Sequence, residues 1–141
     1  MKIYVAYGSN LNKEQMFKRC PGAIYIGSCE IKGYSLVFKR CADIIKSKGK
    51  CPAALWLITK ENEDKLDRYE GVSSGLYKKI KVTVNYGKQT IEGLAYQMTS
   101  LYLNEQKPTD YYYEVCRQGY IDFGLDLKYL EKTFKKVKDK Y

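Results

Sequence analysis

The chain has 141 residues, of which 45% are hydrophobic and 29% charged, and its formal net charge is +9. This length and apolar content fit a single domain over residues 1–141 with a sizeable core. Histidine is absent, which excludes Ser-His-Asp and Cys-His nucleophile systems and the common histidine-containing metal sites. Acid–base chemistry must therefore use Glu, Asp, Tyr, Lys or Cys.

The first part of the chain predicts a strand, a turn and a short helix. Ile3–Ala6 is typical of a buried strand and leads into Gly-Ser-Asn. Asn12 can then cap a helix, with Gln15 at the reciprocal capping position, and Pro21 and Gly22 end that helix.

The next part predicts strands separated by loops. Residues 23–39 are rich in strand-forming residues but are interrupted around Lys32 and Gly33, which predicts two strands. Residues 40–50 are typical of an exposed loop. The apolar run at 53–58 predicts a central strand of the sheet.

A helix and a hairpin follow. Thr59 can cap a helix that ends near Glu70, where Gly71 supplies the positive φ that commonly terminates helices. The clearest hairpin of the chain pairs residues 76–85 with residues 90–98 through a Tyr-Gly-Lys turn.

Two helices are predicted to close the chain, one from near Thr109 and one from Asp126. Strands dominate the middle and helices the end, which implies an α+β fold with a mixed, strongly curled sheet or small barrel and flanking helices. The loops at 40–50 and 100–107 could form lids or specificity walls over a site.

The basic residues and the cysteines give little sign of a specific site. Lysines are densest in the closing helix, whose apolar spacing favours a solvated lysine-rich face over a nucleic-acid surface. Five cysteines without a CxxC pair indicate neither a zinc site nor a disulfide framework. No signal-peptide pattern or long apolar run occurs, so we expect a cytoplasmic protein that does not bind membranes.

Glu70 stands at an unusual place, because a carboxylate at a helix C-terminus is disfavoured by roughly 0.3–1 kcal/mol. Helical spacing puts it on the inward face together with Tyr69, whereas Asp64 and Asp67 are expected to be solvated acids. Partial burial raises the pKa of a carboxyl group toward the range useful to a general base. The alternative is a surface glutamate paired with Arg68 or a nearby lysine.

The segment Ala6–Asn10 is a second candidate. A strand that runs through Gly-Ser-Asn into a helix offers several backbone N–H groups at one place, which can hold an oxyanion or a carboxylate. Gly8 would let a ligand approach the backbone closely. The alternative is an ordinary loop between a strand and a helix.

Together the two motifs, YGSNL at Tyr7–Leu11 and EGVSSGLY at Glu70–Tyr77, resemble the gamma-glutamylcyclotransferase family of the AIG2-like superfamily. The GLAYQM strand and the segment from Pro108 onward resemble the same family. The resemblance implies that Glu70 is the catalytic glutamate. It also implies a substrate-binding set of Tyr7, Gly8, Ser9, Asn10, Leu11, Tyr77, Tyr96 and Tyr112. Core packing is the alternative for the tyrosines, and Tyr112 is flanked by two further tyrosines that could take its place.

The resemblance implies that the α-amine of a γ-glutamyl amide attacks its own γ-carbonyl, releasing 5-oxoproline and an amine or amino acid. It implies a small-molecule γ-glutamyl substrate and no metal or organic cofactor, and it allows a homodimer. The YGSN loop is more similar to the branch that handles γ-glutamyl amino acids or amines than to the glutathione-specific branch. A γ-glutamylamine cyclotransferase and a biosynthetic γ-glutamyl-removing enzyme remain alternatives, and a basic nucleic-acid-binding module is the alternative outside the class.

Overall fold

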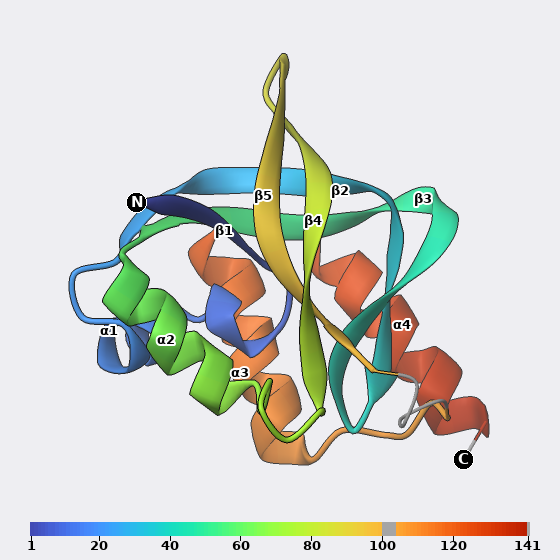
Figure 1. Cartoon of the computed structure of the whole chain (residues 1–141). Coiled ribbons are helices and arrows are strands. Elements are labelled where there is room, and N and C mark those ends of the chain that lie inside the picture. The colour runs from blue at the N-terminus through green and yellow to red at the C-terminus, as the bar shows by residue number, and fades with distance from the viewer. Residues whose placement is uncertain (100–103, 141) are drawn as a thin grey trace.

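A computed structural model describes residues 1–99 and 104–140, with side chains as far as residue 137. Five strands form a closed barrel with helices around it (Figure 1). The strands are β1 (Lys2–Ala6), β2 (Ile24–Lys39), β3 (Cys41–Ile58), β4 (Tyr77–Tyr86) and β5 (Gln89–Met98). The helices are η1 (Ser9–Leu11), α1 (Lys13–Arg19), α2 (Lys60–Tyr69), α3 (Asp110–Asp122) and α4 (Leu127–Lys140). The expected α+β fold with a small mixed barrel is confirmed.

Strand β1 makes the barrel mixed. The strand order is β1-β3-β2-β4-β5, and β1 pairs antiparallel with β3 but parallel with β5, where Tyr4 faces Leu94. A Cβ atom on Gly93 would lie 2.6 Å from a methyl carbon of Val5. The absence of a side chain at this position therefore lets β5 cross close to β1 and close the barrel.

The long β2–β3 ribbon corrects two expectations. The predicted break at Lys32 and Gly33 is wrong: β2 continues through it, and a shift in the pairing register with a φ of +77° at Gly33 marks an irregularity within one strand. The predicted loop at 40–50 is also wrong, because the chain turns at Arg40 and residues from Cys41 onward pair with β2. Residues 45–50 are exposed, so their polar composition is that of a loop although their backbone is paired.

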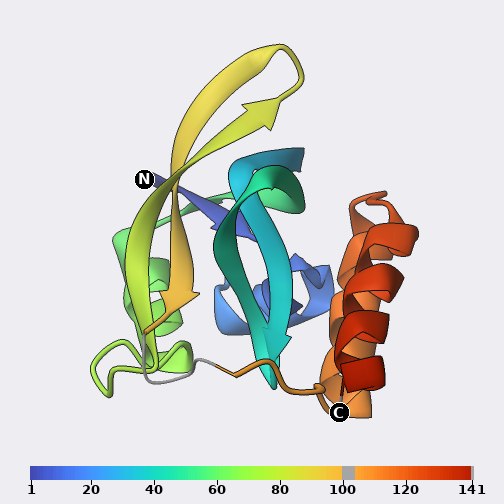
Figure 2. The same cartoon turned by 90° about the vertical axis from the view of Figure 1, so that its right-hand side faces the viewer.

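The β4–β5 hairpin and the capped helices agree with the sequence. The hairpin turns at Gly87, whose φ is +59°, and its tip projects beyond the other strands (Figure 2). Thr59 caps α2 in a reciprocal capping box with Asn62. Asn12 caps α1 by accepting a hydrogen bond from the backbone of Gln15.

Helices α3 and α4 lie side by side along one side of the barrel (Figure 2), and they begin after Thr109 and Asp126 as expected. Residues 100–103 of the expected lid loop lie outside the described residues. In the rest of that loop, the backbone of Gln106 exchanges hydrogen bonds with Phe38 and Arg40 at the β2–β3 turn. Among the described residues, no helix is both long enough and apolar enough to span a bilayer.

Candidate active site

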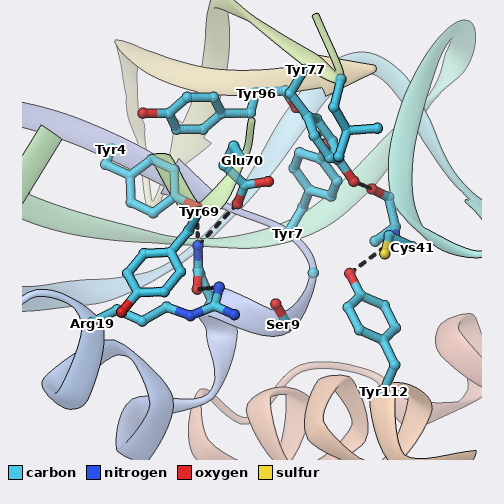
Figure 3. Close-up of a pocket in the computed structure, with 14 residues that line it drawn as sticks. Tyr4, Tyr7, Ser9, Arg19, Cys41, Tyr69, Glu70, Tyr77, Tyr96 and Tyr112 are labelled. Carbon is cyan, nitrogen blue, oxygen red and sulfur yellow. Dashed lines mark hydrogen bonds between the residues drawn. The ribbon is translucent and has the colours of Figure 1, made fainter. Parts of the chain in front are cut away.

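A cavity of about 120 Å³ lies where β1 leads into η1 and where α2 ends (Figure 3). Tyrosine side chains dominate its wall, and a single carboxylate faces into it. The lining residues are Tyr4, Tyr7, Gly8, Ser9, Asn10, Arg19, Cys41, Ala42, Tyr69, Glu70, Leu76, Tyr77, Tyr96 and Tyr112. Apart from Leu11, every site residue named from the sequence lies in this wall.

Glu70 occupies the position after the last residue of α2, with its N–H bonded to the carbonyl of Leu66 at 2.8 Å. Gly71 follows with a φ of +63° and ends the helix as predicted. Burial raises the pKa of the Glu70 carboxyl to about 7, and the nearby Arg19 guanidinium partly opposes this rise. The carboxylate bonds into the cavity wall rather than to Arg68, so the alternative of a surface ion pair does not hold.

Asn10 links Glu70 to its surroundings. Its Oδ1 accepts hydrogen bonds from Gln15 Nε2 at 3.2 Å and from Arg19 Nη1 at 3.0 Å. These two donors fix the orientation of the amide, so that Nδ2 donates to Glu70 Oε1 at 3.3 Å and to the Tyr4 hydroxyl at 2.9 Å. Glu70 is therefore held by the side chain of Asn10, whose orientation is set by Gln15 and Arg19 of α1.

The turn after β1 is shaped by close packing on both sides. A Cβ atom on Gly8 would lie 2.8 Å from Ala42 Cβ, so only glycine fits between the turn and β3. Leu11 is fully buried behind the cavity wall, and its N–H already donates to the Gly8 carbonyl at 3.1 Å. It packs against Gly119 of α3, where an added Cβ would come within 2.5 Å of Leu11 Cβ.

The first N–H groups of a helical turn have no partner within that turn. In η1 these groups belong to Ser9 and Asn10, and both residues line the cavity together with Gly8. The turn therefore offers backbone donors at the cavity wall, close to the carboxylate of Glu70.

Tyr96 connects the cavity to a charged cluster at its edge. Its carbonyl accepts a hydrogen bond from the Tyr7 hydroxyl, and its own hydroxyl donates to Asp67 Oδ1 at 2.7 Å. Asp67 also pairs with Lys79 at 3.0 Å. The expectation that Asp67 is a solvated acid is therefore wrong, because β4 and β5 bring a donor and a cation to it that helical spacing within α2 cannot show.

Tyr77 and Tyr112 both bond to the backbone of Ala42, near the start of β3. The Tyr77 hydroxyl donates to the Ala42 carbonyl at 2.7 Å, and the Ala42 N–H donates to the Tyr112 hydroxyl at 2.9 Å (Figure 3). Burial raises the pKa of both phenols, so they stay protonated at neutral pH. The neighbouring Tyr111 is 79% exposed, which identifies Tyr112 as the tyrosine of this segment that reaches the cavity.

Sequence reasoning missed several lining residues, of which Arg19 matters most for the chemistry. Arg19 follows Gln15 by four positions, so both lie on one face of α1, and this spacing was an available signal. Its guanidinium lies 4.5 Å from the ring of Tyr69 at the edge of the cavity. Cys41 and Ala42 were missed because the sequence predicted a loop where β3 begins.

Comparison with known proteins agrees with this geometry. Residues 52–132 match the AIG2-like family. The gamma-glutamylcyclotransferases of Bos taurus and Homo sapiens are 33% and 31% identical to this chain, over 92% of the chain and 76% of each relative. A solved structure described as a gamma-glutamyl cyclotransferase has a TM-score of 0.82 and 30% identity, covering 96% of this chain and 87% of its own. YkqA from Bacillus subtilis shares the fold with a TM-score of 0.82 at 22% identity, over 97% of this chain and 54% of its own.

The barrel and its tyrosine-lined, glutamate-bearing cavity thus belong to the cyclotransferase class of enzyme domains. More closely, the chain belongs to the gamma-glutamylcyclotransferase family, within the AIG2-like proteins. The family predicted from YGSNL and EGVSSGLY is confirmed.

Proposed function

We propose that the protein converts a γ-glutamyl amide into 5-oxoproline and a free amine or amino acid, with Glu70 as the general acid and base. One observation carries this proposal: the Glu70 carboxylate faces a small cavity beside the backbone donors of η1, and burial raises its pKa to about 7. A carboxyl group of this kind can exchange protons with an amine at neutral pH.

The proposed reaction exchanges one C–N bond for another and moves two protons from the attacking nitrogen to the departing nitrogen. Glu70 takes a proton from the substrate's α-ammonium group, and its raised pKa of about 7 makes this transfer less costly than transfer to an ordinary carboxylate would be. The neutral amine then attacks the γ-carbonyl carbon and the new ring C–N bond forms. As the original amide C–N bond breaks, Glu70 gives the first proton to the departing nitrogen. The ring nitrogen then loses its second proton through the same carboxylate, so that the amine leaves as an ammonium ion, the lactam is neutral and no water is consumed.

Residues around Glu70 would orient the substrate. The N–H groups of Ser9 and Asn10 are suited to bind an anionic oxygen of the γ-glutamyl group. The protonated hydroxyl groups of Tyr77 and Tyr112 fix the opposite wall. Because nucleophile and electrophile belong to one molecule, holding the γ-glutamyl arm in its ring-closing shape supplies much of the acceleration.

A covalent nucleophile from the protein is not needed in this scheme. Cys41 lines the cavity, but burial raises the pKa of its thiol above the ordinary value, which leaves it protonated and poorly nucleophilic. An amine is already a competent nucleophile once it has lost its extra proton. We accordingly propose a reaction in the cytoplasm that requires neither a metal ion nor an organic cofactor.

Incubation of the purified protein with γ-glutamyl dipeptides, γ-glutamyl-ε-lysine and glutathione tests the proposal, with 5-oxoproline as the measured product. Glu70→Gln keeps the shape of the side chain but removes the base, and we expect its rate to fall by about 100-fold or more. Glu61→Gln, an exposed change in the first turn of the same helix, is the matched control and should keep full activity. Equal turnover by the Glu70→Gln and parent proteins would show that another group is the base.

A further inference from the structure

A second hollow, of about 460 Å³, adjoins the cavity between α1 and α2 and is lined by Lys18, Arg19, Lys65, Arg68 and Tyr69. We refer to it as the cationic groove. Arg19 and Tyr69 line both spaces, so the groove adjoins the cavity at these two residues. Figure 3 shows their side chains next to each other. We propose that the cationic groove binds the leaving group of the γ-glutamyl substrate and selects leaving groups that carry two or more negative charges. This inference rests on the function proposed above.

The size of the cavity places the leaving group outside it. Its volume of about 120 Å³ is well below the roughly 300–1,000 Å³ of ordinary ligand pockets. The γ-glutamyl arm must lie inside, because its reacting atoms have to reach Glu70. The other half of the amide must then extend past the cavity wall, and Tyr69, which directly precedes Glu70, belongs to that wall and to the groove.

The charges of the groove favour an acidic occupant. Its lining holds four cationic side chains and no carboxylate. Lys65 and Arg68 are exposed, lie three positions apart on α2, and form no ion pair within the described part of the chain. Lys18 is paired with Glu14 at 3.1 Å on the exposed side of α1, so its charge is partly balanced.

Arg19 supplies a cation at the junction of the two spaces. Its guanidinium is held by Asn10 and lies against the ring of Tyr69, which fixes its position before any substrate arrives. A leaving amino acid with an acidic side chain would place one carboxylate near this group and the second near Lys65 and Arg68. A leaving group with a cationic side chain would be repelled by the same residues.

A matched pair of substrates tests this inference: γ-glutamyl-glutamate and γ-glutamyl-glutamine, which have the same shape but differ by one negative charge. We expect kcat/KM for 5-oxoproline release to be about tenfold higher for γ-glutamyl-glutamate, because several partly exposed cations each contribute a modest attraction. The preference should shrink as salt rises from about 0.1 M to about 1 M, where the screening length falls to roughly 3 Å.

The double variant Lys65→Gln, Arg68→Gln should bring the ratio of the two kcat/KM values close to one. The matched control Lys46→Gln, Lys48→Gln removes two exposed charges of β3 that line neither the cavity nor the groove, and should keep the parent ratio. Equal kcat/KM values for both substrates in the parent protein, or an unchanged ratio in the Lys65, Arg68 variant, would overturn the inference and leave the proposed function intact. Release of 5-oxoproline from other γ-glutamyl dipeptides but from neither of these two would also overturn this inference alone, whereas no release from any γ-glutamyl substrate would overturn the proposed function.

Discussion

Replacing Glu70 with Gln should stabilise the folded protein at alkaline pH but not at acid pH. Burial raises the pKa of this carboxyl from 4.5 to about 7 in the folded state. Below pH 4.5 the group is protonated in both the folded and the unfolded chain, and it favours neither. As the pH rises toward 7 the unfolded chain loses the proton first, so the folded state becomes progressively less stable relative to the unfolded state.

The size of this loss of stability follows from the interval between the unfolded-state and folded-state pKa values of Glu70. Each pH unit between the two pKa values costs about 1.4 kcal/mol, so the parent protein should lose about 3 kcal/mol by pH 8. Gln does not ionise, and the Glu70→Gln protein should avoid this loss. The difference in the free energy of unfolding between variant and parent should therefore grow from near zero below about pH 5 to about 3 kcal/mol at pH 8.

Urea unfolding followed by circular dichroism at several pH values measures this difference. The comparison with the parent cancels the contributions of all other titrating groups. Glu61→Gln serves as the control, since this glutamate is exposed in the first turn of α2, and its effect should stay below about 1 kcal/mol across the range. The same stabilisation by Glu70→Gln at pH 5 and at pH 8 would refute the burial of an ionisable carboxyl group at this position.

Two further changes test the cavity. The Arg19 guanidinium lowers the pKa of Glu70. Arg19→Gln should therefore move the acid limb of the kcat/KM profile above pH 7. An acid limb that stays in place or moves to lower pH would contradict that electrostatic role. Gly8→Ala would put a Cβ atom 2.8 Å from Ala42 Cβ. We expect this change to destabilise the fold by about 1–3 kcal/mol, measured by thermal unfolding. It should also lower activity, measured by 5-oxoproline release. An unchanged melting temperature would mean that the turn can shift without cost.

Local signals in the sequence were sufficient where short-range geometry decides the structure. Thr59, Gly71 and the helical spacing up to Glu70 predicted how α2 begins, ends and directs its carboxylate inward. The order of the two motifs, YGSNL and EGVSSGLY, identified the family and most of the cavity wall. The capping signals of α2 lie within a few residues along the chain, and the family is recognised from the two short motifs and their order.

Contacts between distant segments were not predictable in the same way. Residues 45–50 of β3 are exposed and have the composition of a loop, and only the pairing of β3 with β2 shows that they belong to a strand. Asp67 was expected in solvent because Tyr96 and Lys79, which bind it, belong to β5 and β4 and not to its own helix. The cationic groove likewise forms between two helices whose sequences are separated by the two longest strands.

The place of β1 in the barrel bears on how the chain matures during synthesis. Its antiparallel partner ends at Ile58 and its parallel partner contact is at Leu94, so β1 gains its second neighbour only after Leu94 has been synthesised. Because the turn that follows β1 carries Gly8, Ser9 and Asn10, a nascent chain cannot hold a working site until that late closure. Until then the edge of β1 that pairs with β5 stays open, and a chaperone can bind there.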